Sequence, residues 1–215
     1  MTEVDIDSMN TTKIWLKNYP EGIPAEIDSL GFEDLKDFLD KTLMHGGDRT
    51  AFISMDKKLS YKMLDEYSRD FGAYLHSIGL KSGDKIALMM PNIFQYPIAL
   101  FGAVRAGIIV VNTNPLYTPR EMKLQFQDSD VKAIVIADNF ASNLQEIIKE
   151  TKIEHVILTS IGEMLGAKGV IVNLVIKYIK KLVPSFQLTN TISFSKALKL
   201  GEGKELPEFK SNLDD

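Results

Sequence analysis

Short apolar runs alternate with segments of helical period through the middle of the chain. Lys85–Met90 is an apolar run that leads into a Pro-Asn pair, where Asn92 is expected to cap a helix. Residues 98–105 carry apolar positions at helical spacing, and Gly107 is expected to end that helix. Ile108–Val111 is β-branched throughout, which favours a strand buried on both faces. The pattern predicts a strand–helix–strand unit.

The same alternation continues toward the C-terminus. Thr118–Glu121 has the sequence of a capping box with proline at the first helical position, and it predicts a helix to about Asp128. Ala133–Ile136 and His155–Leu158 predict two further central strands, and Asp138 is expected to cap the helix between them. Short strands with helices between them are typical of βα units. We therefore predict an α/β fold, a doubly wound and mainly parallel sheet with helices on both faces.

The chain before this region predicts two helices and a hairpin. Phe32–Leu43 has a helical apolar period that a Gly-Gly pair ends. Ala51–Met55 and Lys58–Ser60 flank an Asp-Lys pair and predict a short hairpin. Ser60 is then expected to cap a long helix that runs to about Ile78, because apolar residues fall on one stripe along it.

Local composition divides the chain into four parts. Residues 1–12 are expected to be disordered, and residues 13–160 to form the α/β sheet subdomain. Residues 161–199 are expected to be a peripheral helical segment. Residues 200–215 are expected to be a linker toward further chain, because turn residues and charges replace any apolar period there.

Val170–Val183 has a polar and an apolar face on a helical wheel. Asn173 and three lysines share the polar face, and the apolar face carries Ile171, Val175, Tyr178, Ile179 and Leu182. One hypothesis is an interfacial helix in which anionic lipid headgroups contact Lys177, Lys180 and Lys181. The alternative is an amphipathic helix packed on its own domain, with its lysines in water. The segment is too short to span a bilayer.

Composition and charge limit the class of protein. The 215 residues carry a formal net charge of -4, so no nucleic acid partner is expected. The chain has no cysteine, which excludes disulfides and thiolate metal sites. The N-terminus is acidic without an apolar signal segment, and no run of about 18 apolar residues occurs. We expect a cytoplasmic protein, with the inner face of the cytoplasmic membrane as a peripheral docking surface.

A search for catalytic motifs finds none. No G-x-G-x-x-G follows a strand, no G-x-S-x-G is present, and the glycines at 201–203 lack the spacing of a phosphate-binding P-loop. The three histidines, at 45, 76 and 155, have no ligand spacing. The Asn-rich loop at 112–118 follows the carboxyl end of a strand, where such sheets bind ligands, although an Asx turn that caps the next helix explains it equally well. We therefore assign no catalytic, ATP-binding or metal-binding residue.

Four long stretches resemble one family. They are KIWLKNYPEGIPAEI, LSYKMLDEYSRDFGAYL, GLKSGDKIALMMPNIFQYPIALFGAVRAGIIVVNTNPLYTPREM and VIKYIKKLVPSFQL. Together they resemble the N-terminal part of the bacterial long-chain fatty acyl-CoA synthetases, which belong to the adenylate-forming superfamily. The resemblance covers essentially all of residues 13–210 and implies the N-terminal subdomain of the adenylate-forming fold.

The resemblance implies an activity for a longer enzyme. Such a ligase uses ATP and Mg²⁺ to convert a long-chain fatty acid to an acyl-adenylate, and CoA then displaces AMP to give a thioester. The family's phosphate-binding loop and catalytic lysine are expected beyond this sequence, so the chain alone is expected to bind no cofactor and to be inactive. Fatty acid and CoA are the expected substrates, and a membrane surface and a second copy in a homodimer are candidate partners. The alternative is a non-catalytic α/β module that docks on a protein partner or a membrane.

Overall fold

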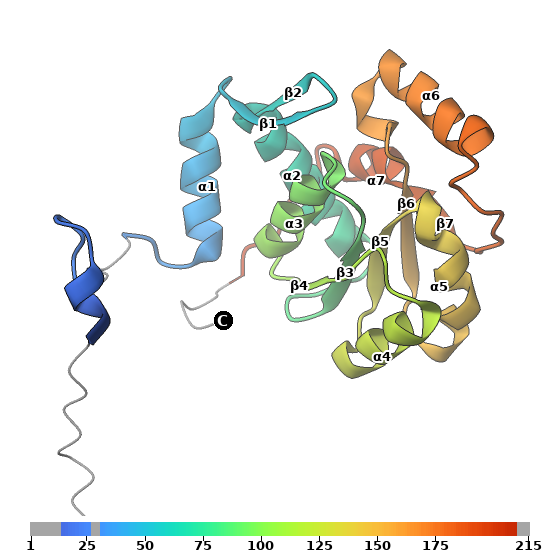
Figure 1. Ribbon diagram of the computed structural model, residues 1–215, viewed down its shortest axis with the longest axis horizontal. Coiled ribbons are helices and arrows are strands. Elements are labelled where there is room, and N and C mark those ends of the chain that lie inside the picture. The colour runs from blue at the N-terminus through green and yellow to red at the C-terminus, as the bar shows by residue number, and fades with distance from the viewer. Residues whose placement is uncertain (1–13, 27–30, 210–215) are drawn as a thin grey trace, which may run out of the picture. The chain divides into compact units, whose positions relative to one another are not determined.

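The structure is a computed structural model that describes residues 14–26 and 31–209 (Figure 1). The chain separates into two compact units, residues 1–32 and residues 33–215. In the first unit, the described residues form one short 3-10 helix, η2 (Ile14–Asn18). The disorder predicted for residues 1–12 and the end of the predicted linker, 210–215, lie outside the described residues.

A five-stranded parallel sheet forms the centre of the second unit. Its strands follow the order β4-β3-β5-β6-β7, with bounds β3 (Lys85–Met89), β4 (Ile109–Asn112), β5 (Ala133–Ala137), β6 (His155–Thr159) and β7 (Thr191–Ser193). Counted along the chain, this is the 2-1-3-4-5 order of a doubly wound sheet, in which the chain first adds a strand on one side of β3 and then builds outward on the other. The predicted fold class is confirmed.

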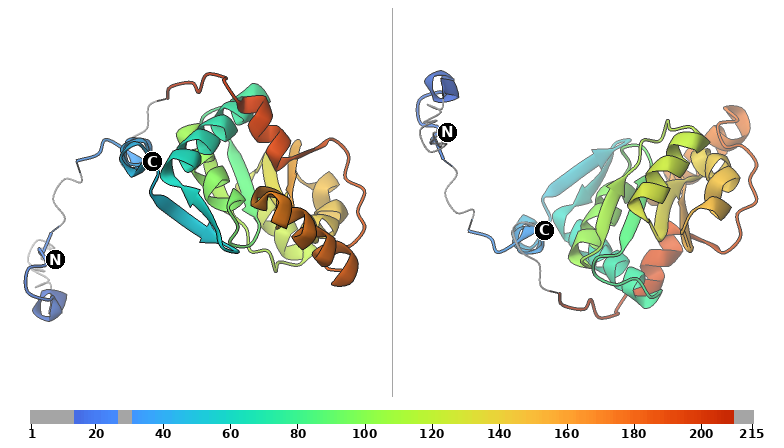
Figure 2. Two further views of the ribbon diagram at one scale, coloured as in Figure 1. Left: turned by 90° about the horizontal axis from the view of Figure 1, so that it is seen from above. Right: turned by 90° about the horizontal axis from the view of Figure 1, so that it is seen from below.

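Helices cover both faces of the sheet (Figure 2). One layer contains α2 (Tyr61–Ser77), α3 (Gln95–Arg105) and α7 (Phe194–Gly201), and the other contains α4 (Pro119–Ser129) and α5 (Ala141–Ile147). Alternate residues of β3 divide between the two layers, with Ile86 and Leu88 in the first core and Ala87 and Met89 in the second. This two-sided burial explains why the central strands are continuous apolar runs.

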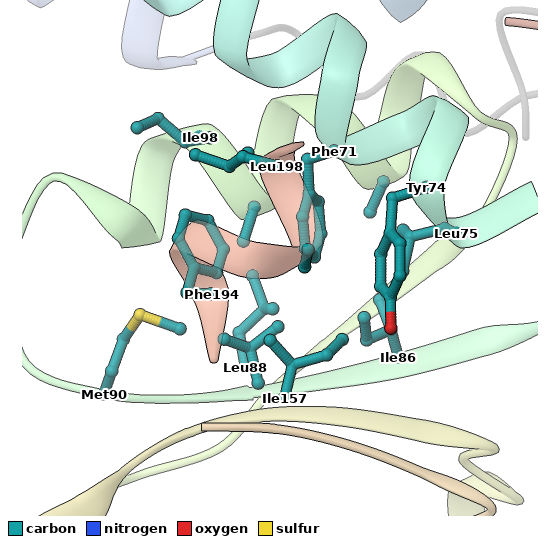
Figure 3. Packing of buried hydrophobic residues seen from close by; sticks show 14 of the residues in the cluster. Phe71, Tyr74, Leu75, Ile86, Leu88, Met90, Ile98, Ile157, Phe194 and Leu198 are labelled. Carbon is teal, nitrogen blue, oxygen red and sulfur yellow. The ribbon is translucent and has the colours of Figure 1, made fainter. Parts of the chain in front are cut away.

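Two buried phenylalanines meet within the largely aliphatic first core (Figure 3). Phe71 of α2 and Phe194 of α7 are fully buried, and their ring centroids lie 5.1 Å apart. Ile157 of β6 lies beneath them in the same cluster. The contact joins α2 to α7, more than a hundred residues later in the chain, so the C-terminal part of the chain is held on the same sheet.

A helix and a hairpin precede α2. Helix α1 (Leu35–Gly46) is capped by Asp34, whose side chain accepts a hydrogen bond from the Asp37 N–H. Strands β1 (Thr50–Ser54) and β2 (Lys57–Ser60) pair antiparallel, and the two residues between them have positive φ, as a tight hairpin turn requires. The predicted hairpin is therefore confirmed, with its turn one residue earlier than expected.

Four residues were predicted to cap the N-termini of helices, and two of them do so in the structure. The Ser60 side chain accepts from the Met63 N–H, and Thr118 forms the full capping box with Glu121. The prediction for Asn92 was wrong, since α3 begins three residues later without a side-chain cap. The prediction for Asp138 was also wrong: a 3-10 turn, η3 (Asp138–Phe140), comes first, α5 begins after it, and another 3-10 turn, η4 (Ile148–Glu150), follows α5.

The strands at both edges of the sheet differ from the sequence-based expectation. The β-branched composition predicted a strand at 108–111 buried on both faces, but β4 is an edge strand, and Ile109 is 50% exposed. At the other edge, β7 is a strand of the central sheet, although residues 161–199 were predicted to be a peripheral helical segment. Between β6 and β7 come the 3-10 turn η5 (Glu163–Leu165), α6 (Ala167–Leu174) and the π-helical turn η6 (Val175–Ile179).

Candidate functional site

The carboxyl edge of the sheet is the first place to look for a site. The chain turns to opposite sides of β3 when it adds β4 and then β5, so the switch point lies between β3 and β5. Doubly wound sheets bind ligands in the crevice outside the carboxyl ends of the strands at such a point. The segment after β3 leads into α3 at Gln95, and the segment after β5 begins with Asp138.

Gln95 is one of the buried polar residues at this edge. Its side chain is 1% exposed, and its Nε2 donates to Thr159 Oγ1 at 2.8 Å and to the Ser160 carbonyl at 2.9 Å. Its Oε1 is also buried and has no hydrogen-bond partner among the described residues. Gln95 therefore joins the start of α3 to the end of β6 and keeps one unfilled acceptor.

Glu163 connects the next elements. Its Oε2 accepts from Thr159 Oγ1 at 2.7 Å, and its Oε1 accepts from the Ser195 N–H at 2.8 Å. Thr159 is almost fully buried, so its hydroxyl is held between Gln95 and Glu163. The three side chains form a continuous chain of hydrogen bonds from α3 across β6 to the first turn of α7.

Asp138 and Asn139 follow β5. Burial raises the pKa of Asp138, while a hydrogen bond from the Asn139 N–H and the nearby positive charge of Lys177 oppose the rise. The nearby negative charge of Glu163 raises the pKa of Asp138 further. Asn139 donates through its Nδ2 to the Leu182 carbonyl at 2.8 Å, which ties the chain after η6 to this edge.

The Asn-rich loop after β4 is held by its own side chains. Asn114 Oδ1 accepts from the Leu116 N–H at 3.0 Å, the bond of an Asx turn. Asn112 accepts from the Tyr96 hydroxyl at 2.8 Å and, through its carbonyl, from Gln125 Nε2 at 3.0 Å. This geometry supports the turn-and-cap interpretation of the loop.

Taken together, the described part of this edge offers amides, hydroxyls and carboxyls on rigid elements. Such groups bind and orient a polar ligand. Over residues 14–26 and 31–209, no three His, Asp or Glu side chains gather as a metal-binding group. The histidines at 45, 76 and 155 lie on α1, α2 and β6 respectively, on three separate elements.

A second feature, a buried arginine, was not predicted from sequence. Arg105 in the last turn of α3 is nearly fully buried, and its guanidinium pairs with Asp40 at 2.9 Å and with Asp65 at 2.8 Å. Its Nη1 also donates to Ser68 Oγ at 2.8 Å. An open cavity of about 500 Å³ borders this cluster, lined also by Lys36, Arg69 and residues 204–206. Because one guanidinium joins α1, α2 and α3, we assign it a structural role.

The predicted membrane-facing lysines are exposed but do not share one helical face. Lys177 lies within η6, Lys180 stands at its C-cap, and Lys181 lies beyond the helix with a positive φ of 51°. Asn173, predicted beside them, points inward, since its Oδ1 accepts from the Gly162 N–H at 2.8 Å and its Nδ2 donates to Ser160 Oγ at 2.8 Å. The helix ends at Ile179, short of the predicted Val183.

Sequence comparisons find close relatives. Residues 39–177 match the family described as AMP-binding enzyme. The long-chain-fatty-acid–CoA ligase of Escherichia coli O6:H1 is 49% identical over 191 residues, which cover 88% of this chain and 34% of that relative. The ligase of the same description from Bacillus subtilis is 32% identical over 73% of this chain and 28% of its own length. This chain thus spans about a third of the length of the curated relatives it matches.

Solved structures share the fold. A long-chain-fatty-acid-CoA ligase from Archaeoglobus fulgidus aligns with a TM-score of 0.67 and 17% identity, over 90% of this chain and 34% of that one. An anthranilate CoA ligase in complex with anthranoyl-AMP aligns with a TM-score of 0.63 and 15% identity, over 85% of this chain and 29% of that one. At these identities the alignments show a common fold.

Proposed function

Because the chain belongs to the family of AMP-binding enzymes, we propose that it is the N-terminal part of a long-chain fatty acid–CoA ligase. The reaction joins a fatty acid to AMP with release of pyrophosphate, and the CoA thiol then displaces AMP to form the thioester. The observation that carries this proposal is the 49% identity to a long-chain-fatty-acid–CoA ligase over 88% of the chain.

In this proposal the chain supplies a scaffold, and further sequence supplies the reacting groups. The five-stranded sheet presents polar side chains at its carboxyl edge, with Gln95 and Glu163 held in place by hydrogen bonds. These side chains would line one wall of a ligand cleft. A non-catalytic docking module is the second candidate, and the exposed apolar surface of α6 is the observation that favours it.

ATP and Mg²⁺ belong to the proposal but do not fit the described residues. The sequence has no glycine-rich phosphate loop, and within residues 14–26 and 31–209 no cluster of carboxylates or histidines could hold a metal ion. We therefore propose that residues outside this chain would hold both groups. The proposal places the enzyme in the cytoplasm, as a monomer or a homodimer. In the described part of the chain, no helix is both long and apolar enough to cross a bilayer.

ATP–pyrophosphate exchange with a long-chain fatty acid tests whether this chain alone can form the acyl-adenylate. The 215-residue chain is expected to fold and to give no exchange, whereas a full-length ligase assayed beside it gives a clear signal. Exchange by the chain at the full-length rate would contradict the proposal. Sequencing the gene beyond codon 215 is the independent check. A Thr/Gly-rich loop is expected there, and a stop codon would favour the docking module.

A further inference from the structure

The helical segment formed by α6 and η6 presents an apolar face to solvent. Six large side chains along it, or just after it, are each at least half exposed: Val170, Ile171, Leu174, Tyr178, Ile179 and Leu182. Val170, Leu174 and Tyr178 recur at steps of four residues, and Ile171 and Ile179 flank them, so these five line one side of the helix. Contiguous exposed apolar side chains of this kind mark a surface that another phase or molecule covers.

The opposite side of the helix fixes this orientation. Gly169 is buried against Gly162, and a Cβ on either glycine would collide with the carbonyl of the other. Asn173, one turn later, bonds to the Gly162 N–H and to Ser160 Oγ. Two successive turns are thus locked onto the 160–165 segment, and the apolar residues must point away from the domain.

Cationic side chains border the C-terminal half of the apolar face. Lys177, Lys180 and Lys181 are all exposed, and the Lys177 ammonium lies 5.7 Å from the centre of the Tyr178 ring. The helix ends with hydrogen bonds from the Lys180 N–H to the Val175 carbonyl and from the Leu182 N–H to the Ile176 carbonyl, which define the backbone path that carries the lysines. Exposed apolar residues and tyrosine beside lysines are the composition of a helix that lies in a membrane interface.

We propose that α6 and η6 lie flat in an anionic lipid leaflet, with the apolar face inserted among the acyl chains and the three lysines at the phosphate level. The inference rests on the proposed function in one respect, since a long-chain fatty acid partitions into the membrane and a docked ligase would collect it there. A second copy of the chain fits the surface less well. Residues 167–183 contain lysines and no carboxylate, so the same face of a second copy would offer the lysines no anionic partner.

Vesicle flotation of the 215-residue chain tests the proposal. The vesicles are phosphatidylcholine with about a third phosphatidylglycerol, and pure phosphatidylcholine is the reference. The chain is expected to float with anionic vesicles, less at high salt. The triple variant K177E/K180E/K181E is expected to bind roughly tenfold or more weakly. As a matched control, K149E/K196E/K199E changes the same net charge at exposed lysines elsewhere and is expected to retain binding.

A second triple variant separates insertion from surface attraction. I171S/L174S/I179S removes apolar side chains from the proposed face and is expected to abolish flotation. L116S/L124S/L200S, at exposed leucines elsewhere, is the matched control and should bind like the parent. If I171S/L174S/I179S bound anionic vesicles as well as the parent chain, the proposed insertion of the apolar face would be overturned. Circular dichroism and a thermal melt verify that each variant is folded.

An indole reporter gives an independent reading. Trp15 is the one tryptophan in the sequence, so W15F combined with Y178W places a single indole on the proposed face. Its emission is expected to shift to the blue with anionic vesicles and to be quenched by brominated lipid. A chain that shows no shift, or dimerises through this face without binding vesicles, would overturn the proposal. The assay contains no ATP or fatty acid, so its result is independent of ligase activity.

Discussion

Gly162 and Gly169 touch backbone to backbone, with the carbonyl oxygen of each where a Cβ of the other would lie. The contact holds the start of α6 against the turn after β6. We predict that G169A destabilises the chain by about 1–3 kcal/mol, because the added methyl forces the helix away from the turn. V170A, at an exposed position of the same helix, is the control. Equal urea midpoints for the two variants would show that the contact is looser than described.

Arg105 should contribute strongly to stability. R105M leaves Asp40 and Asp65 side by side without their shared cation, and we predict a loss of roughly 3 kcal/mol in urea unfolding. Arg69 bonds to Asp65 but is 56% exposed, so R69M should cost less than about 1 kcal/mol. Replacing both aspartates by asparagine in R105M should recover part of the loss. If R105M and R69M unfold alike, the guanidinium does not join the three helices.

Gly107 ends α3 with a φ of 69°, and two effects oppose a side chain there. A Cβ would lie 2.6 Å from Ser82 Oγ and 3.0 Å from the Phe209 ring, in addition to the backbone strain. We predict that G107V costs roughly 1–3 kcal/mol. Gly203 has a similar φ of 71° but open space around it, so G203V isolates the strain. A melting temperature of G107V equal to that of G203V would mean that the collision is relieved.

Asp138 should make the free energy of unfolding fall as the pH rises, the opposite of the effect of an aspartate whose pKa is lowered by an ion pair. Burial raises its pKa in the folded chain, so the ionised form is disfavoured there relative to the unfolded chain. This cost is present at pH values above the folded pKa and disappears as the pH falls below the unfolded pKa. We predict that D138N is more stable than the parent at pH 7 and that the difference shrinks toward pH 3. E146Q, at an exposed carboxyl on α5, is the control. A difference that grows as the pH falls would contradict the assignment.

The sheet and most helices could be predicted because their signals are local. Ser60 and Thr118 cap helices through side chains that act within three residues, and the central strands are apolar runs. The edge position of β4 could not be predicted, because composition does not show whether a strand has a neighbour. Thr191–Ser193 has a single apolar residue, so its pairing with β6 leaves almost no signal in the sequence.

The candidate sites depend on contacts between distant residues. Gln95 meets Thr159 across 64 positions, and Arg105 meets Asp65 across 40, so no spacing rule could connect them. The helical wheel at 170–183 placed Asn173 with the lysines because all are polar. In the structure Asn173 points inward. The close glycine contact places its side-chain amide beside the Gly162 N–H and the Ser160 hydroxyl, and both of these groups need hydrogen-bond partners.

A hybrid enzyme tests the central claim, that this chain is a ligase scaffold completed by further sequence. In it, the chain replaces the matched 191-residue segment of the Escherichia coli relative. The measurement is the rate of CoA thioester formation from a long-chain fatty acid with ATP. We predict a rate within about 100-fold of the parent enzyme, since misplacement by about 1 Å costs that much, and no thioester from either part alone. A folded hybrid that forms no thioester would contradict the assignment of this chain as a ligase scaffold.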